Sequence, residues 1–276
     1  SGFRLPVTHS AWLDRTRPLR FQFNGRDVTG FAGDTVASAL LAQGIVHVGR
    51  SFKLHRPRGI FSCGVEEPTG LIDIGQGSER TPNTRATDIA ALDGLQAFTG
   101  NAWPSLEFDL AALTSRFAAL LPAGFYYKTF MWPHWHMFEP TIRRMAGLGV
   151  AADAPDPDRY DQVSRHVQVL VVGAGAAGVQ AALAAAHSGQ QVLLLEGAAQ
   201  LEPACAARLQ ELQRAGVEVH TGCTVFGLYD HLLAAATQTI DGAVRERLWK
   251  VRAERTILAT GAFERPMLFP DNDRRA

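Results

Sequence analysis

The stretch that most constrains the fold is residues 166–196, HVQVLVVGAGAAGVQAALAAAHSGQQVLLLE. Residues 167–172 form a short run of β-branched and aliphatic side chains, as expected of a parallel strand buried on both faces. A glycine-rich turn follows directly. An alanine-rich helix is then predicted over residues 176–188, with Gly189 just past its end. Residues 191–195 form a second apolar strand. Strand, turn, helix and strand in this order predict a dinucleotide-binding unit.

The turn reads G-x-G-x-x-G, and each small residue has a physical reason to be there. Gly173 permits the tight turn out of the strand, and Gly175 leaves no Cβ in the way of a pyrophosphate. Gly178 lets the helix pack closely on the sheet. Ala176 and Ala177 open the helix, where free N–H groups and the positive end of the helix dipole favour phosphate. These five residues are the predicted phosphate-binding part of the site.

Glu196 ends the second strand, 18 residues after Gly178, where an acidic side chain can accept hydrogen bonds from the hydroxyls of an adenosine ribose. A carboxylate there would repel a 2′-phosphate, which favours NAD or FAD over NADP. Further along, residues 256–262 (TILATGA) predict a strand that returns beside the nucleotide. Thr260 and Gly261 at its end complete the predicted cofactor-binding set, with Gly261 expected to permit the close approach.

Composition excludes several classes of protein. The 276 residues suggest about two domains. Lys plus Arg and Asp plus Glu balance at 27 each, so the overall charge favours neither nucleic acid nor a membrane surface. No apolar run is long enough to cross a membrane, and the first residues lack a signal-peptide pattern. The expectation is a cytoplasmic α/β protein.

The N-terminal pattern predicts a second domain. Residues 20–31 look like a hairpin that turns at Asn24-Gly25. Asp34 or Thr35 then caps a short helix that ends before Gly44. A hairpin followed by a helix is how the β-grasp fold of plant-type 2Fe–2S ferredoxins begins, and the likeness covers about 80 residues.

Cysteine usage argues against an iron–sulfur cluster in that domain. Ferredoxins carry several closely spaced cysteines after the helix, whereas residues 45–68 contain only Cys63. We therefore predict no cluster, and Cys63 is either a relic of an ancestor that had one or a plain buried cysteine. Cys205 and Cys223 lie far away, so neither a disulfide framework nor a paired metal motif is predicted.

The middle of the chain is harder to interpret. Residues 50–58 (RSFKLHRPR) are basic, and they suit either a solvated loop or a site that contacts a partner or an anion. A loop is expected over residues 76–85, and helices over 87–98 and 106–121. Residues 124–138 are dense in aromatic side chains and are expected to fill a junction between domains or subunits. Two histidines there, His134 and His136, lack the company of other metal ligands, so no metal site is predicted. Residues 151–165 are polar and rich in Pro and Asp, and are expected to be a linker. Residues 1–18 show no clear periodicity and are expected to be an extended arm.

After Glu196 the pattern predicts a helix over residues 203–214 and a strand over 217–220. An antiparallel unit begins at residues 224–229, turns near 241–242 and returns over 248–252. A complete domain of this type would continue with a further strand, so we expect the dinucleotide domain to be incomplete.

The predicted fold class is therefore α/β: an N-terminal β-grasp domain of the 2Fe–2S ferredoxin type without a cluster, followed by a Rossmann-like FAD/NAD(P)-binding domain. The expected divisions are residues 1–85 for the ferredoxin-like domain, 86–162 for a helical, aromatic-rich connecting segment, and 163–276 for the dinucleotide-binding domain.

Three stretches carry a family resemblance: GRSFKLHRPRGIFSCGVEEP, GFYYKTFMWP and LATGAFERPMLFPDNDR. With them, from about residue 21 to residue 274, the sequence resembles the α subunits of heterotetrameric sarcosine oxidases. Related amine and opine dehydrogenases have similar large subunits. Two departures stand out. Leu54 replaces an aromatic residue, and the segment after Glu196 is short, which predicts that the adenosine end of the cofactor is held better than the far ring.

The resemblance implies a nucleotide-holding subunit of a multi-subunit flavoprotein. In such enzymes sarcosine is demethylated to glycine, tetrahydrofolate takes the one-carbon unit and oxygen is reduced to peroxide. The chemistry occurs at a flavin in a partner subunit, and FMN lies at a subunit interface. NAD is implied in this chain, with FAD as the alternative, and no catalytic residue is assigned to it. Two other functions stay open: a structural subunit with a fixed nucleotide, and a free-standing electron carrier, for which the cysteine count excludes an iron–sulfur form.

Overall fold

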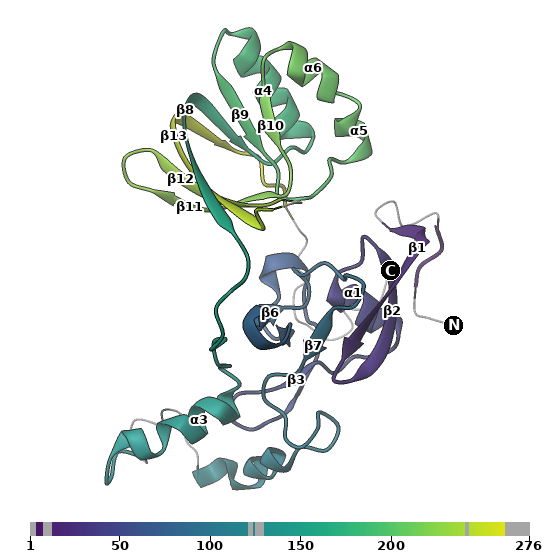
Figure 1. The fold of residues 1–276 in the computed structure, drawn as a ribbon, viewed down its shortest axis with the longest axis vertical. Helices are drawn as coiled ribbons and strands as arrows, with labels where there is room; N and C mark the ends of the chain where they lie inside the picture. The colour runs from purple at the N-terminus through teal and green to yellow at the C-terminus, as the bar shows by residue number, and fades with distance from the viewer. Residues whose placement is uncertain (1–3, 8–12, 121–123, 125–129, 241–242, 263–276) are drawn as a thin grey trace. The chain divides into compact units, whose positions relative to one another are not determined.

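The computed structural model describes residues 4–7, 13–120, 124, 130–240 and 243–262 (Figure 1). The chain divides into two compact units, Ser1–Asp156 and Pro157–Ala276. Among the helices of the described residues, none combines the length and the apolar character needed to cross a membrane.

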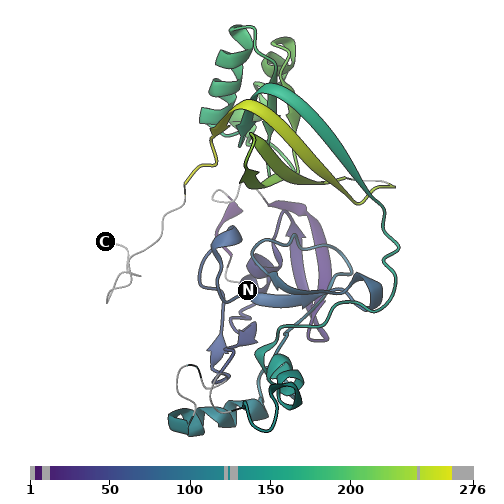
Figure 2. The same cartoon turned by 90° about the vertical axis from the view of Figure 1, so that its left-hand side faces the viewer.

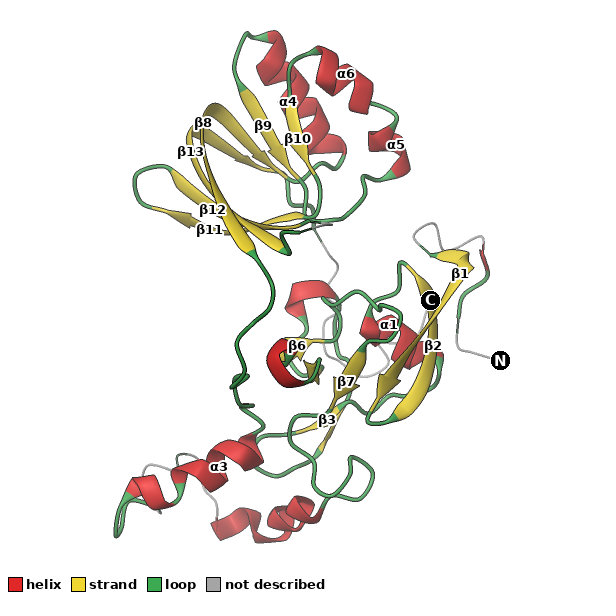
Figure 3. Ribbon diagram, viewed as in Figure 1, coloured by secondary structure: helices red, strands yellow, loops and turns green. Residues whose placement is uncertain are grey.

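The first unit is built on a five-stranded sheet with strand order β2-β1-β7-β5-β6 (Figure 3). Neighbouring strands are antiparallel except β1 and β7, which run parallel. Alternate residues of β1, Leu19, Phe21 and Phe23, enter the core beside Leu40 of helix α1. Strand β7 places residues 96–98 in the same sheet as β1, beyond the expected boundary at residue 85. The strands of this sheet are β1 (Asp14–Phe23), β2 (Arg26–Ala32), β5 (Leu71–Ile74), β6 (Thr81–Arg85) and β7 (Gln96–Phe98), and helix α1 is Val36–Ala42.

The predicted hairpin and helix are confirmed. Asn24 and Gly25 have positive φ angles of 51° and 75°, as a type I′ turn between two strands requires. Helix α1 starts after Thr35, whose hydroxyl accepts the Ser38 N–H while the Ser38 hydroxyl accepts the Thr35 N–H. Gly44 follows the end of the helix with a φ of 76°.

Asp34 fastens the start of α1 to the chain around it. Its side chain is buried, and its carboxylate accepts two hydrogen bonds from the Arg4 guanidinium, at 3.0 and 2.6 Å. It also accepts the Phe31 N–H at 2.8 Å and the Ser38 hydroxyl at 2.6 Å. Burial acts to raise the pKa of Asp34, but these hydrogen bonds outweigh it and hold the pKa below its ordinary value. The ionised form of Asp34 therefore stabilises the folded unit.

Several expectations for the first unit are wrong. Strand β1 begins at Asp14, inside the segment expected to be an irregular arm. Residues 76–85 contain a 3₁₀ turn (Gly77–Glu79) and β6, so they are not simply a loop. The helix expected over 87–98 does not form, because its end becomes β7 and pairs with both β1 and β5. Over 106–121 the structure has a 3₁₀ helix, Leu110–Leu120.

The basic stretch at residues 50–58 makes internal contacts, so a freely solvated loop is the wrong description of it. The Arg50 guanidinium donates to the carbonyl oxygens of Leu106 and His55. His55 is 1% exposed, and its Nδ1 lies 2.8 Å from Oδ2 of Asp109. These contacts tie the stretch to the chain before the 3₁₀ helix. It also contains the short strands β3 (Gly49–Arg50) and β4 (Pro57–Arg58), which pair with each other.

The aromatic-rich segment is described only in part, since residues 125–129 lie outside the described residues. The rings of Phe130 and Phe138 have centroids 5.1 Å apart, while Trp132 is 85% exposed. Within the described residues, His134 and His136 belong to no group of three possible metal ligands. A junction role for this segment stays a prediction. The local elements are a 3₁₀ turn (Trp135–Met137) and α3 (Glu139–Ala146).

The second unit is a six-stranded sheet in the order β10-β9-β8-β13-β12-β11. The first four of these strands are parallel neighbours, and β12 and β11 are antiparallel. Helices α4 and α6 pack on one face around Val179, Leu183 and Leu212. The other face has its own core around Trp249. The elements are β8 (Tyr160–Val172), α4 (Ala176–His187), β9 (Val192–Leu195), α5 (Pro203–Ala206), α6 (Leu209–Arg214), β10 (Glu218–His220), β11 (Cys223–Tyr229), β12 (Leu233–Thr239) and β13 (Glu246–Leu258).

The predicted strand, helix and second strand of this unit are confirmed as β8, α4 and β9. Figure 2 shows the long strands β8 and β13 side by side, and their pairing runs from Tyr160 with Glu246 to Val172 with Leu258. This pairing makes residues 160–165 part of a strand, so the linker expected to continue to residue 165 is wrong there. It also joins the strands expected over 248–252 and 256–262 into β13. The helix expected over 203–214 is two helices, and the turn at 241–242 lies outside the described residues.

Replacing Asp34 by Asn is expected to lower the free energy of unfolding by about 2 kcal/mol at neutral pH, because the Arg4 guanidinium and the buried N–H donors lose an ionised acceptor. The folded pKa lies below the ordinary value of 3.8. The contribution of Asp34 is therefore complete above that value and is lost as the pH falls through the folded pKa. Urea unfolding at a series of pH values measures it.

The control is Asp27→Asn in β2, which removes an exposed carboxylate that accepts only from the Gln22 side chain among the hydrogen bonds described. It is expected to change stability by less than about 0.5 kcal/mol. If the difference in free energy of unfolding between wild type and Asp34→Asn stayed constant down to acid pH, the stabilising role of the ionised Asp34 carboxylate would be contradicted.

Candidate functional site

The predicted site begins at Gly173, the residue directly after β8. Gly173 has a φ of 98°, and its N–H donates to the carbonyl oxygen of Leu195 at 2.8 Å. A Cβ on Gly173 would lie 2.3 Å from the carbonyl oxygen of Ala259. The chain leaving β13 therefore passes directly across the turn, and only glycine provides both the backbone angle and the space.

Gly178 and Gly175 differ sharply in the space around them. A Cβ on Gly178 would lie 1.8 Å from the carbonyl oxygen of Gly173, so the first turn of α4 packs on the glycine turn itself. At Gly175, apart from its own atoms, its two chain neighbours and the nearby helix backbone, no atom of the described residues lies within 4 Å of the place where a Cβ would be. Gly178 is thus required by the protein's own packing, whereas Gly175 faces open space.

The start of α4 is available to a ligand. Gly175 is the N-cap residue and offers no side chain to cap the helix, which begins at Ala176. The first N–H groups of a helix have no partner within it, and no other described residue accepts a hydrogen bond from those of Ala176 and Ala177, so they can bind an anion. The open space at Gly175 lies at this helix end. The residues present therefore fit a pyrophosphate, because a Cβ-free approach and unpaired donors occur together.

Glu196 lies at the end of β9 with its carboxylate turned toward the glycine turn. Its Oε2 accepts the Ala174 N–H at 2.6 Å, and its Oε1 accepts the Ala198 N–H at 2.9 Å. Its own N–H donates to the carbonyl oxygen of His220, and its carbonyl oxygen accepts the Cys223 N–H. An ionised carboxylate has about four lone-pair positions, so this one keeps acceptor capacity for sugar hydroxyls.

Thr260 and Gly261 follow the end of β13. The Ala259 N–H donates to the carbonyl oxygen of Val172 at 2.8 Å, and the Thr260 nitrogen lies 3.3 Å from the Cβ position of Gly173. Gly261 has a φ of 75°, with no described atom near its Cβ position. The close approach that the structure shows is therefore between Ala259 and Gly173. At position 261 glycine is favoured by the positive φ angle and not by a lack of space.

Two contributors were not identified from the sequence, the Ala174 N–H and Ala259. The first contributes only its backbone, which carries no residue-type signal. The second is an alanine whose importance depends on which strand lies beside β8. The structure brings together Gly173, Gly175, Ala176, Ala177, Gly178, Glu196 and Thr260 at the same end of the parallel strands, with Gly261 next in the chain.

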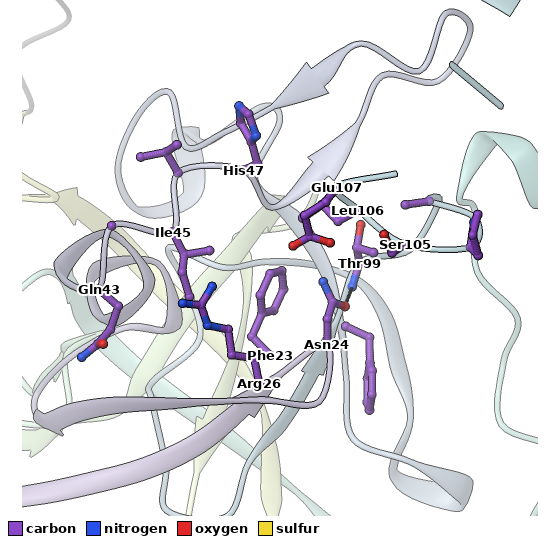
Figure 4. A pocket seen from close by; sticks show the side chains of 15 residues that line it. Phe23, Asn24, Arg26, Gln43, Ile45, His47, Thr99, Ser105, Leu106 and Glu107 are labelled. Atoms are coloured by element: carbon purple, nitrogen blue, oxygen red, sulfur yellow. Dashed lines mark hydrogen bonds between the residues drawn. The ribbon is translucent and has the colours of Figure 1, made fainter. Parts of the chain in front are cut away.

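A separate cavity of about 520 Å³ lies within the first unit (Figure 4). Arg26, His47 and Glu107 are its charged or titratable lining residues, and the Thr99 N–H donates to Oδ1 of Asn24 at 2.8 Å beside it. None of the predicted site residues lines this cavity. The glycine turn of the second unit remains the candidate site.

Comparison with known proteins supports the resemblance found in the sequence. Sarcosine oxidase subunit alpha of Rhizobium meliloti (strain 1021) is 44% identical over 304 residues, and the match covers 99% of this chain. The chain is similar to this α subunit over almost its whole length. The corresponding protein of Corynebacterium sp. (strain U-96) is 35% identical over 97% of this chain. The chain spans only 30% and 26% of the lengths of these two relatives.

Family matches confirm the predicted order of domains, a 2Fe–2S ferredoxin-type domain followed by a dinucleotide-binding domain. Residues 16–102 match the 2Fe-2S iron-sulfur cluster binding domain, and residues 147–261 match the pyridine nucleotide-disulphide oxidoreductase family. The second match implies FAD or NAD binding. Among solved structures, L-proline dehydrogenase from P. horikoshii is similar, with a TM-score of 0.52 and 18% identity over 94% of this chain and 44% of that chain. At this identity the likeness shows a shared fold.

The residues of the first unit do not fit the cluster that its family is named for. A [2Fe–2S] cluster is held by four ligands, usually cysteine thiolates. Within residues 16–102 of this chain, Cys63 is the single cysteine, and its side chain is exposed. Across the described residues, no three His, Cys, Asp or Glu side chains are placed to share a metal ion.

Adding one methyl group at Gly178 is expected to lower the free energy of unfolding of the second unit by about 1–3 kcal/mol, because the new Cβ meets the backbone of Gly173. The matched variant, Gly175→Ala, adds the same group where the structure is open and is expected to change stability by less than about 1 kcal/mol. Thermal unfolding of both variants measures the difference. Equal destabilisation would show that the turn is packed differently.

Proposed function

We propose that the second unit binds an adenine dinucleotide, NAD, at the glycine turn. The observation that carries the proposal is the pairing of an open, Cβ-free approach at Gly175 with the unpaired N–H groups at the start of α4. In this proposal Ala176 and Ala177 bind the pyrophosphate, and Glu196 orients the ribose through its hydroxyls. Thr260 and Gly261 lie beside the bound nucleotide.

At the level of the whole protein, we propose a subunit of a multi-subunit flavoprotein that demethylates a secondary amine such as sarcosine by oxidation. The support is the 44% identity to a sarcosine oxidase α subunit over nearly the whole chain. A bound nicotinamide or flavin ring supplies the electron-accepting chemistry, and this chain binds and orients the nucleotide. Amine oxidation is proposed for a partner subunit, with FMN at a subunit interface, and no residue of this chain is proposed as catalytic.

The alternative nucleotide is FAD, which the matched oxidoreductase family and the proline dehydrogenase-like fold also suit. Glu196 does not separate the two, because both carry an unphosphorylated adenosine ribose. A fixed, non-catalytic nucleotide is the further alternative. Identifying the bound molecule and measuring turnover distinguish the three.

Heating the purified chain is expected to release one NAD per chain, identified by chromatography and by its absorption spectrum. Gly175→Val is expected to weaken this binding by at least about tenfold, because its side chain occupies the space proposed for the pyrophosphate. The control is Ala207→Val, which adds similar bulk at an exposed position between α5 and α6.

A flavin band in the released nucleotide would replace NAD by FAD. If Gly175→Val bound the nucleotide as tightly as the wild type, the glycine turn would not be part of the binding site. In the assembled enzyme, lost turnover with intact assembly would support a redox role for the nucleotide, whereas failed assembly would support a packing role.

Glu196→Gln is expected to weaken NAD binding by about tenfold, because charge-assisted hydrogen bonds to the ribose and to the Ala174 N–H are lost. It is also expected to narrow the preference for NAD over NADP, since the amide no longer repels a 2′-phosphate. Equilibrium titration with both nucleotides measures the two effects. Glu246→Gln, at the opposite end of β13, removes the same charge and is expected to change neither. An unchanged preference in Glu196→Gln would place the ribose elsewhere.

A further inference from the structure

A buried carboxylate lies at the centre of the loop between residues 59 and 70. Glu67 is 1% exposed. Its Oε2 accepts the N–H groups of Phe61 and Ser62, at 2.7 and 2.5 Å. Its Oε1 accepts the N–H groups of Thr69 and Gly70, at 2.7 and 2.8 Å, and the Thr69 hydroxyl at 3.0 Å. Both ends of the loop thus turn their N–H groups inward onto one anion.

The loop closes tightly around this side chain. The Thr69 hydroxyl also lies 2.8 Å from the carbonyl oxygen of Gly59, so its single proton can go to either of two oxygens, and a Cβ on Gly70 would lie 3.1 Å from Cγ of Glu67. Arg85 donates to the backbone oxygen of Glu67 at 3.2 Å, which attaches the loop to β6. The loop is therefore held by hydrogen bonds from fixed backbone groups to a charged acceptor, which are stronger than those between neutral groups.

The loop that contains Glu67 lies where cluster-bearing domains carry their cysteine ligands. It follows α1 and precedes β5, inside the region that matches a 2Fe-2S cluster binding domain. In cluster-bearing domains the ligand cysteines come from such a loop, and hydrogen bonds to the cluster sulfurs tune it. A cluster with its thiolates is an anion surrounded by donors. Here the inward N–H groups meet Glu67 instead, while Cys63 stays exposed.

We propose that the Glu67 carboxylate takes the structural place of the iron–sulfur cluster in this β-grasp domain. It is the internal anion around which residues 61–70 fold, and the loop reaches its final conformation without iron. Glu67 is a positioning residue in this sense, because it holds four backbone groups and touches no reacting atom. The proposal concerns the first unit and does not depend on the nucleotide proposed for the second.

Hydrogen exchange on the full chain tests the proposal directly. In the wild type, the amides of Phe61, Ser62, Thr69 and Gly70 are expected to be protected although the loop is at the surface. Glu67→Gln keeps the shape but loses the charge, and its amide NH₂ faces donors. It is expected to speed exchange at these amides by at least about tenfold, with the amides of β1 unaffected. If the four loop amides were unprotected in the wild type, the proposal would be overturned. This wild-type measurement tests the proposal even if the variant does not fold.

A second experiment tests whether the chain can assemble an iron–sulfur cluster. Wild-type chain incubated anaerobically with ferrous iron, sulfide and a thiol reductant is expected to take up no stoichiometric iron and sulfide. Cys63→Ser is expected to leave the four amides protected as in the wild type. Stoichiometric cluster formation that is lost in Cys63→Ser would overturn the proposal, as would loop amides that exchange at the same rate in Glu67→Gln and in the wild type.

Discussion

The second unit depends on one backbone contact, the crossing of the chain after β13 over the glycine turn after β8. Gly173 lies against the carbonyl of Ala259, and Gly178 lies against the carbonyl of Gly173. Three backbone segments, the end of β8, the start of α4 and the exit of β13, thus meet with no side chain between them. Because protein interiors are close-packed, a single added methyl group at this point cannot be absorbed by side-chain movement. Beside this contact, the start of α4 and Gly175 face space that the described residues leave open.

In the first unit, buried carboxylates meet hydrogen-bond donors in separate places, and three of them lie outside the strands of the sheet. Asp34 is held by Arg4 and by groups around the start of α1. Glu67 is held almost wholly by backbone N–H groups. Asp109 pairs with His55. An ionised group away from water is stable only with such partners. These carboxylates therefore fix segments of the first unit that lie outside the strands of its sheet.

Local signals in the sequence predicted the elements that local chemistry decides. Asn24-Gly25 indicated a hairpin because asparagine and glycine tolerate positive φ, and Thr35 indicated a cap because its hydroxyl reaches the first helical turn. The helical pattern over residues 87–98 misled, because β1 and β5 offer that segment backbone partners that no local pattern records. The linker predicted over residues 151–165 is too long for the same reason, because its polar residues 160–165 pair with β13. The domain divisions and the ligand contacts of each site residue stay predictions.

By itself, the sequence determined the order of strand, glycine turn, helix, strand and acid in the second unit, because each of these follows from short-range sterics and hydrogen bonding. It also determined that Cys63 has no second cysteine near it in the chain. Only the tertiary structure decided that Gly175 is open while Gly178 is packed, that Glu196 turns toward Ala174, and that Glu67 lies at the centre of a loop. These depend on segments far apart in the chain, or on backbone N–H groups that every residue except proline shares, so no pattern of residue types could have shown them.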